Sequence, residues 1–199
     1  MPLMRLLFSI VFGIVLGLTV HLLSVLGLPK IASGDAYSRL AAITPLNAVM
    51  QLPVADANNS PIPFMDPAFA QAICRYDLTA GPLKLKVPVS PTYTSLSFYN
   101  RNNTAYYAIN DRSAGRKIIE LDLMTEAQHA ARPGDPEVTA ADRLIIDAPT
   151  PTGLIVMKAL AAEPSLMAQA QASLQAATCT IDTSSASAPS DSKAGAEEE

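Results

Sequence analysis

Arginine and tyrosine side chains beside acidic and amide groups are the residues of this sequence best suited to chemistry. Arginine can clamp a carboxylate or phosphate through two hydrogen bonds, and tyrosine can stack on a ring or a sugar. These residues fall at predicted strand ends, where loops converge. The candidate ligand or partner contacts are Arg75, Tyr76, Asp77, Tyr99, Asn110, Asp111 and Arg112. The alternative is that the Asp and Asn side chains form turns and the arginines pair with them.

Residues for catalysis or metal binding are scarce. A Ser-His-Asp or Cys-His arrangement outside the apolar N-terminal run depends on His129 alone, and a zinc site would need more ligands than His129 and the two cysteines supply. The spacing of the Asp and Glu residues indicates no particular catalytic pair of carboxylates. Glu120 and Asp122 alternate along a predicted strand, and we expect them on its solvent-exposed face. We therefore name no catalytic residue, no metal and no cofactor, and we lean away from an enzyme.

The two cysteines, Cys74 and Cys179, lie far apart in the sequence. In an oxidising compartment such a pair predicts a disulfide, which would join the end of the last helix to the start of the sheet. Closing a loop of about 100 residues contributes up to roughly 4.7 kcal/mol in the chain-entropy model. Two separate buried thiols are the alternative.

Residues 6–28 carry no charge and are bracketed by Arg5 and Lys30. A helix of about 23 residues is roughly 34 Å long, enough to cross a hydrocarbon core of about 30 Å. The run is longer than the roughly 7–15 apolar residues of a cleaved signal peptide, for which Ala32 and Gly34 would supply the small residues. We therefore predict an uncleaved transmembrane helix.

Orientation rests on the short N-terminal tail, because the basic residues are nearly balanced across the helix. A tail of residues 1–5 is expected to stay in the cytoplasm, which places the main domain in the periplasm and the helix in the bacterial inner membrane. Within the helix a possible packing face repeats every four residues and contains a GxxxG pattern. Its members are Ser9, Gly13, Gly17 and His21.

The net charge of −4 belongs to the C-terminal segment, where Asp182, Asp191 and residues 197–199 outnumber Lys193. The rest of the chain is neutral by this count, so it offers no basic field for nucleic acid. Residues 181–199 have a composition that cannot build a core, and we predict a disordered acidic tail.

The remainder predicts a mainly β domain with a few helices, an antiparallel sandwich or barrel-like fold. Residues 83–89 alternate apolar and polar, residues 94–99 and 104–109 flank a turn-forming stretch, and residues 153–160 are nearly continuously apolar, as in a central strand. Helices are predicted at 35–43 and 125–131 and after Pro164. The expected organisation is a linker at 29–67 followed by a β-rich domain at 68–180.

Several short blocks resemble the bacterial family known as domain of unknown function 1254. They are residues 73–78, 80–82, 97–100 and 108–112, within a resemblance that covers 44–180. The resemblance implies a β-rich envelope protein and carries over no catalytic residue. Larger members add a second domain, domain of unknown function 1214, for which we expect a separately encoded partner here.

Taken together, the sequence predicts a membrane-anchored interaction subunit that pairs with a separate protein. The alternative is a β-domain that binds or hydrolyses an envelope carbohydrate or lipid. A partner would cover an exposed apolar edge or face, whereas a ligand would occupy a concave pocket that holds Arg75 or Arg112.

Overall fold

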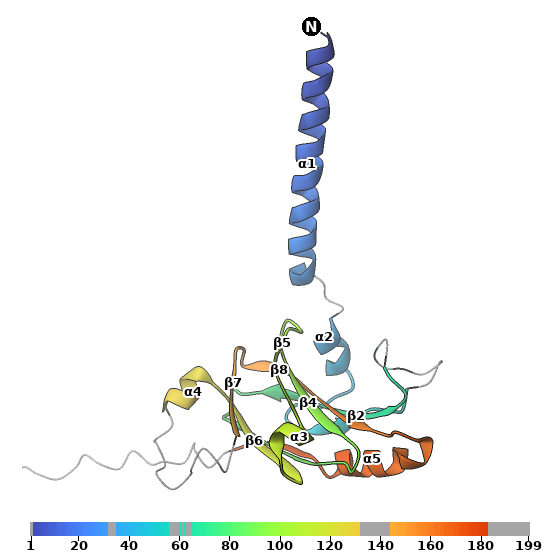
Figure 1. The fold of residues 1–199 in the computed structure, drawn as a ribbon. Helices are drawn as coiled ribbons and strands as arrows, with labels where there is room; N and C mark the ends of the chain where they lie inside the picture. The colour runs from blue at the N-terminus through green and yellow to red at the C-terminus, as the bar shows by residue number, and fades with distance from the viewer. Residues whose placement is uncertain are drawn as a thin grey trace, which may run out of the picture.

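A computed structural model of the chain describes residues 2–31, 35–55, 60, 62, 65–131 and 144–182. Helix α1 (Pro2–Ile31) stands away from a β-rich body. The short helix α2 (Ala36–Ala41) follows it and lies at the side of that body that faces α1 (Figure 1). Ala32 and Gly34, which the alternative of a cleaved signal peptide would require, and residues 183–199 of the predicted tail lie outside the described residues.

The larger of two sheets has five strands in the order β1-β2-β8-β4-β5, and every neighbouring pair is antiparallel. The apolar strand at 152–160 lies in the middle, as the sequence predicted, because it is covered on both faces. Its strands are β1 (Val49–Gln51), β2 (Phe69–Asp77), β8 (Thr152–Leu160), β4 (Thr94–Asn100) and β5 (Ala105–Asn110).

The second sheet has four strands in the order β7-β6-β3-β9. They are β7 (Leu144–Ala148), β6 (Ile118–Thr125), β3 (Leu83–Pro88) and β9 (Thr178–Ile181). The pairing of β6 with β7 is parallel, which corrects the expectation of antiparallel pairs throughout. A parallel pair needs a long crossover, and the chain between these strands includes helix α4 (Glu126–Ala131).

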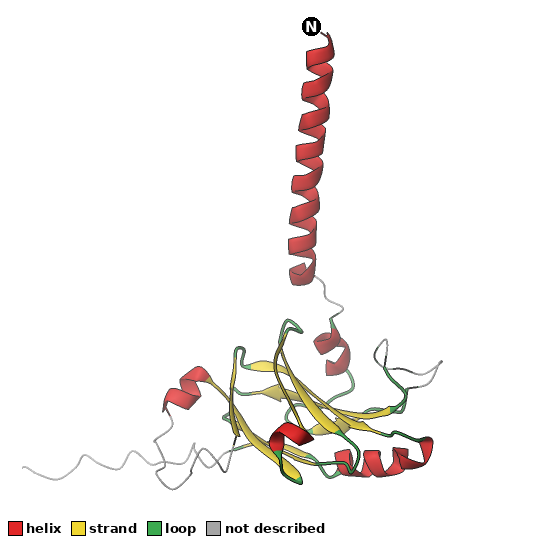
Figure 2. Cartoon of the chain, in the orientation of Figure 1, coloured by secondary structure: helices red, strands yellow, loops and turns green. Residues whose placement is uncertain are grey.

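The two sheets pack face to face as a sandwich, and the described strands form no closed barrel (Figure 2). Alternate side chains of each sheet point into the shared core, where Tyr76, Phe98, Leu85 and Ile155 are fully buried. This arrangement follows from the period of two along each strand. The predicted β-sandwich is therefore confirmed, with the helices around its rim.

Helix α5 (Met167–Gln175) follows a 3-10 turn at Pro164–Leu166 and packs on the sandwich through buried Ala170 and Leu174. Both residues lie in the helix predicted after Pro164. Helix α4 begins with a capping box, in which the Thr125 backbone N–H donates to Gln128 Oε1 and the Gln128 N–H donates to Thr125 Oγ1. The predicted turn after β5 is instead the single helical turn α3 (Asp111–Ala114).

The disulfide between Cys74 and Cys179 is present, with the two Cα atoms 6.5 Å apart. It does not join a helix end to a sheet, as the sequence indicated, because Cys179 lies on strand β9. It connects β2 of one sheet to β9 of the other. Strand β9 continues to Ile181, inside the segment 181–199 that was predicted to be a disordered tail. Asp182 follows it at 9% exposure, with its carboxylate 2.7 Å from Lys84 Nζ. The folded domain therefore includes these two residues.

A smaller apolar cluster covers the outer face of the five-stranded sheet. Leu40 of α2 and Leu52 pack on Ile73 and Leu154, which point outward from β2 and β8. Tyr37, Ile62, Met65 and Tyr99 border this cluster. The segment that the sequence described as a linker thus contributes to the packing of the domain.

Candidate functional site on the outer face of the five-stranded sheet

The seven candidate contact residues do not form one group. Arg75, Tyr76, Asp77 and Tyr99 lie where β2 and β4 end, whereas Asn110 pairs with Ser95 at the start of β4. Ser95 and Tyr99 are four residues apart on the strand, about 14 Å along the sheet. The structure therefore places Asn110, Asp111 and Arg112 away from the other four.

Tyr76 points into the core and is fully buried. Its hydroxyl lies 3.2 Å from the hydroxyl of Tyr106 and donates weakly to the carbonyl of Tyr99 at 3.4 Å. Burial raises the pKa of Tyr76 and of Tyr106, so both stay neutral. Gly153 faces this ring, and a Cβ there would overlap the Tyr76 hydroxyl and the Tyr99 carbonyl. Tyr76 serves the packing of the core.

Arg75 and Tyr99 point to the outer face, where Arg75 contacts the segment after α2. The Arg75 guanidinium donates to the carbonyl of Thr44 at 3.0 Å and lies 5.7 Å from the centre of the Tyr37 ring. The Arg101 guanidinium lies 4.2 Å from the centre of the same ring. Two cations thus lie within about 6 Å of the centre of the Tyr37 ring, an arrangement that is electrostatically favourable.

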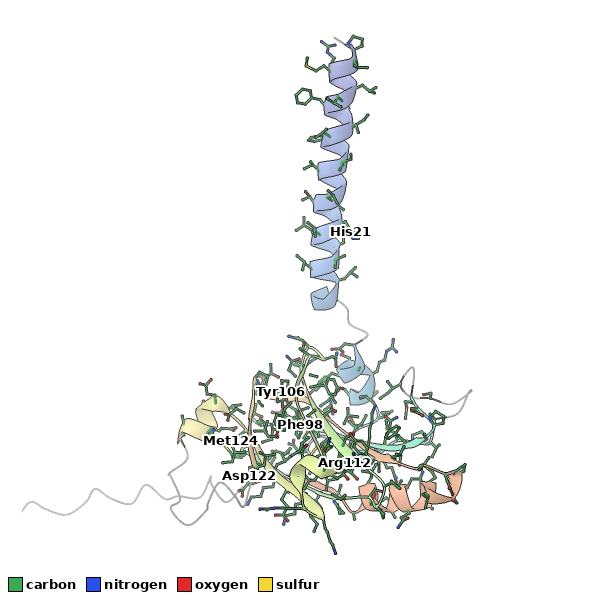
Figure 3. All side chains as sticks on the ribbon, viewed as in Figure 1. His21, Phe98, Tyr106, Arg112, Asp122 and Met124 are labelled. Carbon is green, nitrogen blue, oxygen red and sulfur yellow. A yellow bond between two sulfur atoms is a disulfide. The ribbon has the colours of Figure 1, made fainter. Side chains whose placement is uncertain are left out.

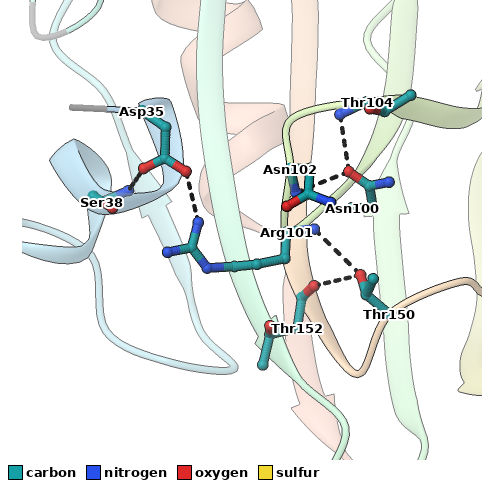
Figure 4. Close-up of polar contacts among 8 residues, drawn as sticks. All are labelled: Asp35, Ser38, Asn100, Arg101, Asn102, Thr104, Thr150 and Thr152. Atoms are coloured by element: carbon teal, nitrogen blue, oxygen red, sulfur yellow. Dashed lines mark hydrogen bonds and ion pairs between the residues drawn. The ribbon is translucent and has the colours of Figure 1, made fainter. Parts of the chain in front are cut away.

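Asp35 completes this contact and was not among the sequence candidates, and neither were Tyr37 and Arg101. Its Oδ1 caps α2 by accepting from the Ser38 N–H at 2.8 Å, and its Oδ2 lies 2.6 Å from Arg101 Nη1 (Figure 4). Partial burial opposes the charge, but the hydrogen bonds from Ser38 and the Arg101 guanidinium hold the pKa of Asp35 below its ordinary value. The helix-start pattern at Asp35 was the only signal in the sequence.

The turn between β4 and β5 fixes Arg101 in place. Asn100 Oδ1 accepts hydrogen bonds from the N–H groups of Asn102 and Thr104, both at 2.9 Å. The Arg101 N–H donates to Thr150 Oγ1, which in turn donates to the carbonyl of Thr152 (Figure 4). Since these bonds hold the turn, the guanidinium presented to α2 comes from a defined backbone.

The remaining polar candidates serve local structure. Asp77 Oδ1 accepts from the N–H and hydroxyl of Thr79, and these hydrogen bonds lower the pKa of Asp77. Asn110 caps α3 by accepting from the Ser113 N–H at 2.8 Å. Asp111 and Arg112 lie in that single turn. These contacts match the turn-forming alternative recognised in the sequence.

His129 and Asp147 form an exposed pair, with Nδ1 and Oδ1 2.9 Å apart. Two members do not make a triad, and no group of three or more His, Cys, Asp or Glu that could hold a metal occurs within the described ranges. On the outer face of the four-stranded sheet Lys86 pairs with Glu120. Asp122, expected on a wet face, is instead 2% exposed.

A groove of about 210 Å³ lies between α2 and the outer face of the five-stranded sheet. Of the seven sequence candidates only Tyr99 lines it. Apolar side chains dominate its walls, and Gln71, Asn103 and Lys158 are its polar members. The lining residues are Ala36, Leu40, Ile62, Met65, Gln71, Tyr99, Asn103, Leu154, Val156 and Lys158.

Helix α1 makes a different kind of surface. It is the one helix among the described residues that is long and apolar enough to cross a membrane, over Pro2–Leu28. Its large side chains are exposed, as for Phe12 at 69%, and side chains project from it on all sides (Figure 3). A Cβ at Gly13 or Gly17 would meet nothing within 4 Å, so the predicted packing face is open.

Comparison with known proteins identifies similarity of sequence and of fold. The family described as "Protein of unknown function (DUF1254)" matches residues 46–180. The VPA0106 protein from Vibrio parahaemolyticus has a similar structure, with a TM-score of 0.56 and 13% sequence identity over 82% of this chain and 38% of its own. An uncharacterized protein from Burkholderia cenocepacia matches at a TM-score of 0.42 and 20% identity, over 60% of this chain and 33% of that one. No protein with a curated description matches.

The similarity to the Vibrio protein concerns the fold alone, because the two sequences are only 13% identical. The chain spans less than half the length of the Vibrio protein. No ligand or reaction comes from these relatives, so the functional argument depends on the residues of this chain.

Proposed function

The chain belongs to the DUF1254 family of proteins of unknown function, and from that premise we propose that it is a membrane-anchored β-domain of the bacterial envelope that acts as an interaction subunit. The observation that carries this proposal is α1. Its apolar side chains are exposed to the surroundings of the chain, as for Phe8 at 70%. In water such a surface is unfavourable, whereas in a bilayer it is solvated.

The disulfide supports an oxidising compartment for the β-domain. Structural disulfides persist in the periplasm and outside cells and are rare in reducing cytosol. The bond between Cys74 and Cys179 joins the two sheets, so it belongs to the folded domain. An N-terminus in the cytoplasm, a spanning helix and a periplasmic domain satisfy both observations.

Protease accessibility tests this topology. In spheroplasts of a bacterium that expresses the full chain with a C-terminal tag, added protease should digest the β-domain without membrane lysis. The matched control replaces Arg5 by a neutral residue and adds three lysines directly after Lys30, which should favour the opposite orientation because the flank richer in Lys and Arg stays in the cytoplasm. Protection of the wild-type domain until lysis would contradict the proposed orientation.

An apolar strip beside edge strand β1 supports the interaction role. Ile43 and Leu46 are 45% and 46% exposed, and Met50 and Val54 are each 37% exposed. Strand β1 is the end strand of its sheet, and no other described strand pairs with its outer edge, a kind of edge to which another chain can add. The open Gly13 and Gly17 face of α1 offers a second contact, within the membrane.

Purification of the tagged full chain from detergent-solubilised native membranes, with mass spectrometry of what accompanies it, tests the partner. A second protein in near-stoichiometric amount is expected, and Leu46→Asp should release it. The matched control is Ile145→Asp, which adds the same charge at an exposed apolar residue of the other sheet. A folded wild-type protein that elutes alone would contradict the role as a subunit.

A second candidate function is the binding of an apolar envelope ligand, and the groove beneath α2 favours it. The ligand-binding alternative from the sequence expected Arg75 or Arg112 in the pocket, but neither residue lines this groove. The groove is built on Leu154 and its neighbours instead. The lining favours a lipid-like ligand over a carbohydrate, because sugars need many polar partners.

A further inference from the structure

The groove follows the central strand of the five-stranded sheet. Its floor consists of the outward-pointing side chains of Leu154, Val156 and Lys158 on β8. Four residues of strand correspond to a length of about 14 Å. Tyr99 lies opposite Leu154 at one end, and Gln71 lies opposite Lys158 at the other.

The two ends of the groove differ in polarity. Around Leu154 the walls are mostly apolar, since Leu40 of α2 faces the sheet there, and Asn103 is their polar member. At the other end Lys158 is half-buried beside Gln71, which is 5% exposed. Within the described part of the chain no carboxylate lies at ion-pair distance from Lys158. An anion at this end would gain a charge-assisted hydrogen bond.

Two other strand lysines, on the outer face of the four-stranded sheet, have carboxylate partners, whereas no described carboxylate pairs with Lys158. Lys84 Nζ lies 2.7 Å from Asp182, and Lys86 Nζ lies 3.1 Å from Glu120. Both are on β3 of the four-stranded sheet. Among the described residues, Lys158 thus lines the groove without a carboxylate partner, as expected when the counter-charge belongs to a ligand.

The size of the groove limits the occupant. A volume of about 210 Å³ exceeds the roughly 150 Å³ that holds a benzene ring and falls below the roughly 300 Å³ where drug-sized pockets begin. A single aliphatic chain fits this volume and the 14 Å floor. Two acyl chains on one glycerol do not.

The groove is also close to the proposed membrane anchor. Only residues 32–34 separate the end of α1 at Ile31 from Asp35, so that cap lies at most about 14 Å from the helix end. Asp35 is fixed to the domain by Arg101, and Ala36 after it lines the groove. An amphiphile dissolved in the adjoining bilayer has a short path to this site.

We propose that the groove binds a long-chain carboxylate drawn from the bilayer, with its carboxylate on Lys158 and Gln71 and its chain along Val156 and Leu154. This inference deepens the second candidate function and does not depend on the protein partner. Lys158 supplies the charge that selects an anionic head group. The apolar wall formed by Leu40, Ile62 and Met65 supplies the affinity for the chain.

Photocrosslinking in a membrane tests the assignment. The full chain is reconstituted in phosphatidylcholine nanodiscs with dodecanoic acid that carries a diazirine in its chain, and crosslinks are mapped by mass spectrometry. The matched probe is dodecanol with the same diazirine. Label on α1, which contacts the bilayer in either case, normalises the probe concentration.

Dodecanoate should label the segment 154–158 and Met65, and Lys158→Met should reduce that labelling about tenfold or more, as expected for a lost charged hydrogen bond. Lys86→Met, on the other sheet, should change nothing. Val156→Trp fills the groove and should abolish labelling while Lys158 remains. Formation of the Cys74–Cys179 disulfide reports folding in each variant.

Two results would overturn the proposal and are distinguishable. If acid and alcohol label the groove equally and Lys158→Met changes neither, the carboxylate assignment fails while binding of an apolar ligand stands. If neither probe labels the groove above the level of β7, whose Ile145 is exposed on the other sheet, the second candidate function fails as well. The membrane-anchored interaction role is unaffected by either result.

Discussion

The outer face of the four-stranded sheet carries lysines that meet carboxylates, whereas a helix and a loop cover the outer face of the five-stranded sheet. On the first face, the partners of Lys84 and Lys86 are Asp182 and Glu120. On the second, Leu40 of α2 lies on Ile73 and Leu154. This difference is the reason why we propose a ligand site on the covered face, which has both the groove and the connection to α1.

The same comparison separates two kinds of energy. Surface ion pairs contribute about 0–1 kcal/mol each, because water screens them and side-chain entropy opposes them. Burial of a leucine side chain contributes about 1.5–3 kcal/mol. We therefore expect substitutions on the covered face to affect stability far more than those on the charged face.

Removal of the disulfide should have the largest effect, because it holds together the two sheets that carry these faces. Cys74→Ala with Cys179→Ala is expected to lower the free energy of unfolding by about 2–5 kcal/mol. Urea denaturation of the full chain in nanodiscs measures this loss. Reduced wild type is the matched control and should unfold with the double variant. Loss of only one sheet's structure would show that the faces belong to separate units.

Leu40→Ala tests the covered face directly. Leu40 is 2% exposed, and its truncation should cost about 2–3 kcal/mol, since transfer and cavity terms add. The measurement is again urea denaturation. Ile118→Ala, on β6 at 45% exposure, is the control and should cost far less. Similar losses for the two variants would mean that α2 does not hold the sheet.

Asp35→Asn tests how α2 is attached, with a smaller expected effect of about 1 kcal/mol or less. Asparagine still caps a helix, so the variant removes mainly the charge that faces Arg101. Because the folded-state pKa of Asp35 is lowered, its carboxylate stabilises the fold above the unfolded pKa and loses this effect as pH falls through the folded pKa. The stability difference between wild type and variant should therefore shrink below about pH 3.8. A difference that grows on acidification would contradict this assignment.

Lys86→Ala should have the smallest effect. The pair that it forms with Glu120 is exposed, with 54% and 36% of the two side chains accessible. The free energy of unfolding should change by less than about 0.5 kcal/mol, and added salt should remove the change. A loss comparable to that of Leu40→Ala would remove the distinction between the faces.

Much of the fold could be predicted from periodicity. The run at 153–160 is apolar on both faces of its strand, and it lies at the centre of the sheet under α2. The stretch at 100–103 forms the turn between β4 and β5, with Asn103 at φ 59°. Strand β9 was missed because it has only four residues, too few to show a pattern. Its pairing with β3 depends on tertiary contacts that no local pattern reveals.

The candidate site was harder to predict. Asp35 and Arg101 meet across 66 residues of sequence, and neither carries a local signal of the other. Arg112 was a candidate contact and Arg101 was not, but the register of β5 against β4 puts Arg112 at the opposite end of the sheet from Arg101. Nothing in the sequence distinguishes Lys158 from other strand residues. Its position is distinctive only because α2 covers this face of the sheet.

The measurement that tests the central claim most directly is the intact mass of the protein extracted from washed native membranes in the presence of a thiol-alkylating reagent. An anchored domain in an oxidising compartment predicts a mass that retains α1 and carries no alkyl group, because Cys74 and Cys179 are joined. A mass that lacks the first 30 or so residues would show that the apolar run is a cleaved signal. Two alkylated cysteines would place the domain in a reducing compartment, and either result would contradict the account.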